Sequence, residues 1–429
     1  MNAHELLNHD IKCECGRVHR CDIETLKIGK GVIDEIDVLL SKYKHILLVA
    51  DCNTYPLCGD KVSALLKDKI QNKYIFNVEG LLVPNEESAA TIDALVTPET
   101  DLVLGIGSGV INDLCKYVSF FKKIKSGIVA TAPSMDGFAS SGAAMILSGM
   151  KVTVTTHAPN VILGDVNVLK GAPTEMIAAG YADIIGKYSS LNDWKLASIV
   201  TGEHLCPFIY DIVLDATNEI RSLASDIIAR DPYAIGKLME TLVVSGMCLT
   251  LNTNTRPGSG SEHHLSHFFE ITGLIENKPY FLHGTDVGYS AIVTAELREK
   301  IVAVDNPTFY KISEEDRIAC YKKIYHDYWS EVNDIQVKAK SYENDLTKIY
   351  LEKWDEIRTV LSECPTADEI REMLVEVGFD LPAFEKFYGK AKIENSTFFG
   401  KDLKDRYSML WIYFALFMND EQVKKILNN

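Results

Sequence analysis

Four of the eleven histidines lie within one stretch of 21 residues, in a pattern that suits metal binding. His263, His264 and His267 occur in the run GSGSEHHLSH, and His283 follows with a glycine after it. His263 and His267 are four positions apart, so both rings point the same way if this segment is helical. A carboxylate, Asp183, lies in a separate apolar segment. One carboxylate and two imidazoles from separate segments can hold a divalent ion and leave coordination positions open.

Each of these pieces also has an ordinary structural interpretation. A single buried histidine is more often a hydrogen-bonded core residue than a ligand, and Asp183 with Lys187 can be a plain helix pair at a spacing of four. The pieces occur together, downstream of a glycine-rich turn, and this combination favours a functional site.

That glycine-rich turn, GIGSGVIND, follows an apolar run that ends at Leu104. Glycines at a strand-to-helix turn let backbone N–H groups approach a pyrophosphate, and the helix N-terminus adds a positive dipole. The turn departs from G-x-G-x-x-G because its third glycine comes one residue early, and it does not follow the first strand, so we do not expect a standard Rossmann unit. A second loop, TAPSMDGFASSG from Thr131, has the small and hydroxyl residues that suit contact with a flat ligand.

Asp51 ends the first apolar run and has two interpretations of equal weight. At the carboxyl edge of a parallel sheet it can accept hydrogen bonds from an adenosine ribose and disfavour a 2′-phosphate. Alternatively it caps the turn at Asn53 and Thr54.

The elements that must position these residues change in character along the chain. Apolar runs at 45–50, 73–78, 101–104 and 127–131 predict strands, and amphipathic stretches at 59–70, 86–97 and 110–123 predict helices between them. This alternation indicates a parallel sheet of βαβ units, and residues 151–168 predict a hairpin or edge strands.

Helical periodicity dominates after about residue 172. We therefore expect an α/β domain over 1–170 and an all-helical domain over 171–429, packed around a shared cleft. The predicted helices are 173–194, 207–229, 232–252, 281–302, 313–342, 343–362, 366–377 and 402–419.

Composition limits the kinds of partner. The formal charge of −16, from 44 basic and 60 acidic residues, repels nucleic acid and anionic membranes, so an anionic substrate needs a local positive site. The N-terminal residues lack the pattern of a signal peptide, and no apolar run is long enough to span a bilayer. We expect a cytoplasmic protein with no membrane insertion and no nucleic-acid partner.

Cysteines near the N-terminus offer a second metal hypothesis. Cys13, Cys15, His19 and Cys21 could close a small zinc site around Gly16. The C-x-C spacing is tighter than the usual C-x-x-C, so a hairpin that turns at Gly16 with reduced thiols is the favoured interpretation.

The chain resembles the glycerol-1-phosphate dehydrogenases, which belong with the metal-dependent alcohol and glycerol dehydrogenases and the dehydroquinate synthases. The matching motifs are GSGVIND, TAPSMDGFASS, GYADIIGKYSS, GSEHHLSH and the HG at 283–284, in the family's order over about the middle half of the chain. The resemblance implies a nucleotide-binding α/β domain, a helical domain, and an active site in the cleft between them.

The resemblance also implies roles for individual residues. It implies that Asp183, His263 and His283 bind one divalent metal ion (zinc, nickel or iron), and that Asp136, Asp183 and His267 contact substrate. Lys187 and Arg256 are candidates for binding its phosphate because they flank the metal segments. The residues implied to hold NAD or NADP are Asp51, Gly107, Gly109, Val110, Ile111, Asn112, Asp113, Thr131, Ala132, Pro133, Ser134 and Ser140.

The implied reaction is the reversible reduction of dihydroxyacetone phosphate to sn-glycerol 1-phosphate, a step of glycerophospholipid synthesis. The metal acts as a Lewis acid on the C2 oxygen, and His267 or Asp136 is the catalytic residue that positions a hydroxyl or relays a proton. A homo-oligomer, dimer or larger, is expected. The alternatives are a glycerol dehydrogenase for unphosphorylated polyol, a dehydroquinate-synthase-like lyase, whose metal position usually carries Glu where this chain has Asp183, and a catalytically silent binding protein.

Overall fold

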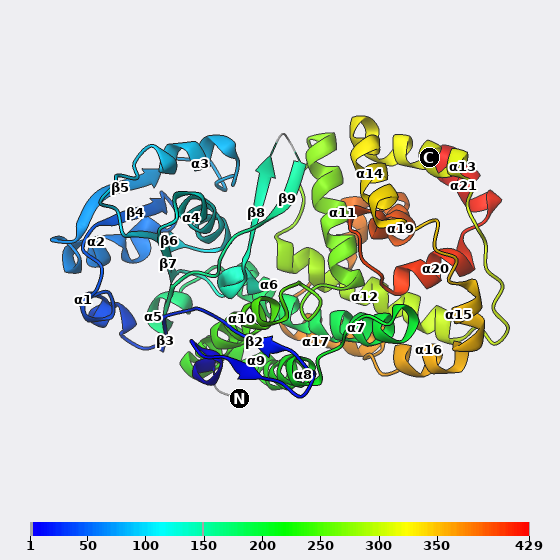
Figure 1. Ribbon diagram of the computed structural model, residues 1–429, viewed down its shortest axis with the longest axis horizontal. Helices are drawn as coiled ribbons and strands as arrows, with labels where there is room; N and C mark the ends of the chain where they lie inside the picture. Colours follow the sequence, from blue (N-terminus) through cyan, green and yellow to red (C-terminus); the bar gives the residue numbers. More distant parts are fainter. Residues whose placement is uncertain (1–2, 148–149, 429) are drawn as a thin grey trace. The chain divides into compact units, whose positions relative to one another are not determined.

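The computed structural model describes residues 3–147 and 150–428, which form two compact units (Figure 1). The first unit contains residues 1–184 and 211–255, and the second contains 185–210 and 256–429. This division differs from a single boundary near residue 170, because residues 211–255 cluster with the N-terminal sheet. Whether 1–170 and 171–429 are independent domains stays a prediction.

The first unit is built on a six-stranded parallel sheet in the order β3-β10-β7-β6-β4-β5. The central strands β4 and β6 are buried at every position, as continuous apolar runs in a sheet covered on both faces should be. The strands of this sheet are β3 (Thr25–Gly29), β4 (Ile46–Asp51), β5 (Ile70–Phe76), β6 (Leu102–Gly107), β7 (Lys125–Ala130) and β10 (Val161–Asp165).

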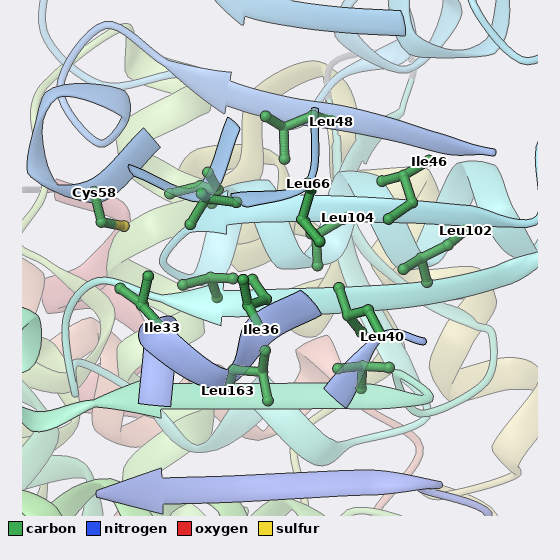
Figure 2. Close-up of a cluster of buried hydrophobic side chains, with 14 of the residues drawn as sticks. Ile33, Ile36, Leu40, Ile46, Leu48, Cys58, Leu66, Leu102, Leu104 and Leu163 are labelled. Atoms are coloured by element: carbon green, nitrogen blue, oxygen red, sulfur yellow. The ribbon is translucent and has the colours of Figure 1, made fainter. Parts of the chain in front are cut away.

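Helices cover the sheet. One face packs its Ile46, Leu48, Leu102 and Leu104 side chains against the η2, α1 and α2 segments (Figure 2). Helix α4 packs against β6 and β7. The helical elements of the first unit before residue 186 are η1 (Ala3–Leu6), η2 (Val32–Glu35), α1 (Ile36–Leu39), α2 (Tyr55–Leu65), α3 (Glu86–Asp93), α4 (Gly109–Lys122), η3 (Asp136–Ala139), α5 (Val166–Leu169) and α6 (Thr174–Ile185).

Two hairpins and three later helices complete this unit. β1 (Ile11–Lys12) pairs with β2 (Val18–His19), and β8 (Gly142–Leu147) pairs with β9 (Met150–Thr155), both antiparallel. Helices α8 (Pro207–Arg221), α9 (Ala224–Ile228) and α10 (Pro232–Asn252) follow, and α8 starts just before the unit boundary. The Asp231 side chain caps α10 by accepting from the Tyr233 and Ala234 N–H groups.

Helix α10 is long and apolar enough to cross a membrane by length and composition alone. However, 78% of its most apolar window is buried inside the structure, as in the core helix of a globular protein.

All regular elements among the described residues of the second unit are helices, and α11 and α12 are in extensive contact with each other. Its elements are α7 (Lys187–Thr201), α11 (Ser261–Glu276), α12 (His283–Val302), α13 (Glu314–Tyr325), η4 (His326–Tyr328), α14 (Trp329–Ala339), α15 (Thr347–Glu352), α16 (Trp354–Leu361), α17 (Ala367–Glu376), α18 (Leu381–Tyr388), α19 (Lys390–Phe399), η5 (Gly400–Leu403), α20 (Met409–Phe417) and α21 (Asp420–Asn428).

The predicted fold class, a parallel α/β part followed by a helical part, is confirmed, and so are the four predicted strands and the three helices between them. Strand β3 was not predicted. The prediction for 151–168 was partly wrong, because β9 does form a hairpin but β10 lies inside the sheet between β3 and β7. Several long predicted helices are divided. For example, 173–194 becomes α6 and α7, which meet at Gly186.

Candidate functional site

The two loops predicted to hold a dinucleotide lie side by side at the carboxyl ends of β6 and β7. The Thr131 N–H donates to the Gly107 carbonyl at 3.0 Å, and the hydroxyls of Ser108 and Ser134 are 2.6 Å apart. This is the edge of a parallel sheet where ligands bind in open α/β folds.

Helix α4 begins directly after the first loop. Its N-cap residue, Ser108, makes no side-chain capping bond to the helix, and the first turn, from Gly109, contains no acidic residue. N–H groups at such a helix end, with the positive end of the helix dipole, suit a pyrophosphate. The structure therefore fits a dinucleotide at this edge.

Asn112 and Asp113, two of the predicted cofactor residues, contact the second loop and the strand β8 that follows it through their side chains. The Asn112 amide, 1% exposed, donates to the carbonyls of Gly137 and Phe138 at 3.3 and 3.4 Å. Asp113 accepts from the Ala144 N–H and pairs with the buried Lys116 at 2.8 Å. These contacts hold the loop in place whether or not either residue touches the cofactor.

Small residues in these loops also allow close packing. A Cβ at Gly107 would lie 2.6 Å from the Ile111 side chain, so this glycine makes room for the helix that follows. Thr131 and Ala132 are both 2% exposed, and the Ser140 hydroxyl donates to the Gly137 carbonyl at 3.2 Å. Pro133 and Ser134 are on the second loop, and Val110 is in the first turn of α4.

Asp51 makes the turn-capping contacts that were one of its two interpretations. Its Oδ1 accepts from the backbone N–H groups of Asn53 at 2.9 Å and Thr54 at 2.8 Å, and from the Thr54 hydroxyl at 3.0 Å. Its role at a ribose stays a prediction.

Asp136 and Asp183, from different elements of the first unit, lie together. An Asp183 oxygen accepts the Asp136 backbone N–H at 2.9 Å, and the Ser245 hydroxyl donates to the Asp136 carboxylate at 3.0 Å. Both aspartates are buried, with exposed fractions of 0% for Asp183 and 8% for Asp136. The second loop, α6 and α10 thus fix the position of two predicted site residues.

In the second unit, α11 and the first residue of α12 bring three histidines together. The ring centroids are 5.1 Å apart for His263 and His283, 5.7 Å for His267 and His283, and 6.2 Å for His263 and His267. The segment 261–276 is helical, so the spacing of four does place His263 and His267 on one face.

A carboxylate lies against each of two of these rings. His263 Nδ1 lies 2.7 Å from the buried Glu262 Oε1, and His283 Nδ1 lies 3.4 Å from Glu270 Oε1. In the neutral ring a carboxylate at Nδ1 keeps the proton there, so Nε2 is left as a donor to a metal. Imidazoles held in this way by carboxylates fit a divalent metal.

The structure shows which of the neighbouring residues His263 and His264 is the better candidate for a metal ligand. Their spacing alone does not distinguish them. His264 is 0% exposed, and both of its ring nitrogens are buried without a hydrogen-bond partner. Burial, with Lys404, Arg406 and Arg256 nearby, holds the pKa of His264 well below its ordinary value of 6.5. His264 is a neutral core residue.

Glu262 and Glu270 were not predicted as site residues, although both lie on the helix that carries the histidines. His267, Glu270 and His283 also offer three ligand atoms within 4.8 Å of one another. Glu270 is therefore either an orienting carboxylate or an alternative ligand.

A cluster of cations surrounds the segment before α11. Lys187, 0% exposed, donates to the Gly258 carbonyl at 3.1 Å, Lys404 donates to the Ser259 hydroxyl at 3.0 Å, and Arg406 donates to the Ser259 carbonyl at 2.8 Å. Burial, and after it Arg256, lowers the pKa of Arg406 to about 10. Arg256 itself forms a partly buried ion pair with Glu203. This cluster is a candidate for the local positive region that we expect an anionic substrate to need in a chain of net charge −16.

Sequence reasoning missed Lys404 and Arg406, because they lie about 145 positions from Ser259 in a region without motifs. The sequence contained no local signal for this contact.

Comparison with known proteins identifies the class and then the family. A family model described as "Iron-containing alcohol dehydrogenase" matches residues 27–173. Sulfoacetaldehyde reductase from Bifidobacterium kashiwanohense, in complex with NAD+, has the same fold with a TM-score of 0.62 at 12% identity, over 96% of this chain and 98% of that one.

Sequence relatives are closer. The chain is 34% identical to the glycerol-1-phosphate dehydrogenase [NAD(P)+] of Bacillus licheniformis over 68% of this chain and 74% of that protein. It is 30% identical to the protein of the same name from Geobacillus thermodenitrificans, over 85% and 86% of the two chains. The chain belongs to the glycerol-1-phosphate dehydrogenase family.

Proposed function

We propose that this protein is an NAD(P)-dependent sn-glycerol-1-phosphate dehydrogenase that reversibly reduces dihydroxyacetone phosphate. The observation that carries the proposal is the family membership at 34% identity. The oriented histidines and the uncapped start of α4 are consistent with it, because the reaction needs a metal and a dinucleotide.

In the proposed site Asp183, His263 and His283 hold one divalent ion, which when bound polarises the C2 oxygen of the substrate and stabilises negative charge on it. Zinc, nickel and iron all suit this donor set. Glu262 keeps the His263 ring in the ligating tautomer. His267 or Asp136 positions the terminal hydroxyl or moves a proton to and from the substrate oxygen.

The chain's other proposed contacts hold the cofactor and the phosphate. The first-turn N–H groups of α4 bind the pyrophosphate, and the loop from Thr131 lies against the nicotinamide half. Lys404 and Arg406 join Lys187 as candidates for the substrate phosphate, because charge-assisted donors recognise it best. The protein acts in the cytoplasm as a homo-oligomer, with a small phosphorylated polyol as substrate.

The decisive test compares two ketones. Oxidation of NADH and NADPH is followed with dihydroxyacetone phosphate and with dihydroxyacetone, using metal-loaded protein. We expect kcat/KM to be much higher for the phosphorylated ketone, and the product to be resistant to an sn-glycerol-3-phosphate-specific oxidase. Equal turnover of both ketones would favour the glycerol dehydrogenase alternative and overturn the proposal.

A variant of Lys404 tests the proposed contact with the substrate phosphate. Lys404→Met removes one charge-assisted hydrogen bond, so kcat/KM for dihydroxyacetone phosphate should fall by about tenfold or more, mainly through KM. Activity on dihydroxyacetone should not change. Lys425→Met, which removes an exposed lysine paired with Glu394, is the matched control. An unchanged KM in Lys404→Met would exclude Lys404 from the phosphate site.

A further inference from the structure

The short hairpin near the N-terminus gathers three side chains that favour a soft metal ion. The ligand atoms of Cys13, Cys15 and His19 lie within 4.8 Å of one another. The Cys15 sulfur is 3.4 Å from His19 Nε2. All three residues belong to the first unit and are separate from the histidines of α11 and α12.

The turn between the strands brings the two sulfur atoms together. The Gly16 N–H donates to the Cys13 carbonyl at 3.1 Å, and Gly16 has φ of +86°, which few other residues adopt. The Cys15 N–H points at the Cys13 sulfur at 3.5 Å. Backbone N–H groups directed at sulfur stabilise a thiolate, which is the form that binds metal.

The histidine is held by a second element. His19 is 1% exposed, and its Nδ1 lies 2.9 Å from the Leu251 carbonyl near the end of α10. A carbonyl only accepts, so Nδ1 donates to it, and in the neutral ring Nε2 then presents its lone pair toward the Cys15 sulfur. Carbonyls orient metal-ligating histidines in the same way.

The strands of the hairpin are short. Each strand has two residues, and Val18, the first residue of β2, is 61% exposed. A two-stranded hairpin is marginally stable in water, and a bound metal adds its binding free energy to folding.

We propose that Cys13, Cys15 and His19 bind a structural zinc ion that fixes the hairpin against α10. Two thiolates and an imidazole are the ligands that zinc prefers in structural sites, and a further ligand from outside these three completes the tetrahedron. The sequence favoured a metal-free hairpin and included Cys21 in the alternative. The contact with Leu251, 232 positions from His19, reverses that preference, and Cys21 is not among the grouped ligand atoms.

Cobalt substitution of the full chain tests the proposal, because only a thiolate site gives sulfur-to-cobalt charge transfer in the near ultraviolet. The proposed Asp183, His263 and His283 site has no sulfur. We expect the charge-transfer band in the cobalt-loaded wild-type protein and in cobalt-loaded His283→Ala. In Cys13→Ser/Cys15→Ser we expect the band to disappear, and the amount of bound metal to fall by one equivalent per chain. Cys52→Ser, which changes a part-buried cysteine outside the cluster, should keep the band. Cobalt-loaded wild-type protein without the band would overturn the proposal.

A measurement on the unaltered protein guards against variants that misfold. Cys13 and Cys15 are partly exposed, so an alkylating reagent should label them quickly unless metal holds their sulfurs. We expect mass spectrometry to find them protected until a chelator is added, while labelling of Cys52 changes little. Equal labelling of Cys13 and Cys15 before and after chelation would contradict a bound zinc ion.

Discussion

At the scale of single residues, a neighbouring carboxylate distinguishes a proposed metal-binding histidine of the second unit from a histidine of the core. Glu262 is 0% exposed, and its Oε1 accepts from the Gly260 N–H at 2.8 Å while facing His263 Nδ1. It fixes both the start of α11 and the tautomer of the first proposed ligand. The neighbouring His264 has no such partner and stays neutral in the core.

Replacement of this carboxylate should weaken the proposed metal site. In Glu262→Gln, we expect metal affinity to fall by about 10- to 100-fold, because the group that holds the proton on Nδ1 loses its charge. Competition with a chelator, followed by metal analysis, measures the change. Glu276→Gln, at the other end of α11, removes a carboxylate paired with Lys278 and Lys392 and should leave metal affinity as it was. Equal affinity in the two variants would mean that Glu262 only caps the helix.

His264 should make stability depend on pH. Its pKa is depressed in the folded protein, so below about pH 6.5 the unfolded chain binds a proton that the folded chain does not. Above that pH the residue does not change the free energy of unfolding. Below it, proton binding to the unfolded chain lowers the free energy of unfolding by up to about 1.4 kcal/mol per pH unit. In His264→Met the free energy of unfolding should therefore fall less between about pH 7.5 and 5.5 than in wild type. Urea denaturation in the presence of chelator measures it, and the exposed His9→Gln is the control. Parallel pH profiles for His264→Met and wild type would refute the assignment.

At the scale of elements, two glycines let helices approach the loop that carries Asp136. A Cβ at Gly180 on α6 would lie 1.9 Å from the Pro133 carbonyl oxygen, and a Cβ at Gly246 on α10 would lie 2.5 Å from the Asp136 carbonyl oxygen. Both contacts are with backbone, which cannot turn aside as a side chain can.

Gly180→Ala should therefore displace the loop. We expect a loss of about 1–3 kcal/mol of stability or more, together with weaker binding of NADH, because Thr131 and Ser134 move with Pro133. Gly236→Ala is the control in a helix of the same unit, since its Cβ would meet Val166 at an ordinary 3.4 Å and alanine favours a helix by about 1 kcal/mol. Thermal denaturation and NADH fluorescence titration measure the two effects. If Gly180→Ala bound NADH as tightly as Gly236→Ala, the loop position would not depend on this contact.

Local patterns predicted the elements well where burial is complete, as in β4 and β6. Local patterns failed where a neighbouring element determines whether a segment forms a strand. β3 is the mixed sequence TLKIG, and it is a strand because β10 lies beside it in register from Thr25 to Gly29. The candidate site shows the same division. Its loops and histidines were predicted from motifs. The supporting contacts of Glu270, Lys404 and Arg406 depend on tertiary packing that no spacing reveals.

At the scale of the whole molecule, charge and burial argue against binding to membranes. The net charge is −16, and the most apolar helix, α10, is largely buried. We expect no co-flotation with vesicles that contain anionic phospholipid at physiological ionic strength, because like charges repel and the apolar helix α10 is largely buried. Phosphatidylcholine vesicles are the control for lipid without charge, and co-flotation with the anionic vesicles alone would show a basic surface that the net charge hides.

The order of residues in the first unit has a consequence for synthesis. Its sheet is complete by residue 165, yet Ser245, which bonds to Asp136, and Leu251, which holds His19, come from the segment 211–255. In a chain emerging from the ribosome, the N-terminal hairpin and the dinucleotide loop therefore cannot form these contacts until α10 has been synthesised. Fragments that stop between residues 170 and 255 should be recognised by chaperones or proteases as unfinished, even though every strand of the main sheet is already present.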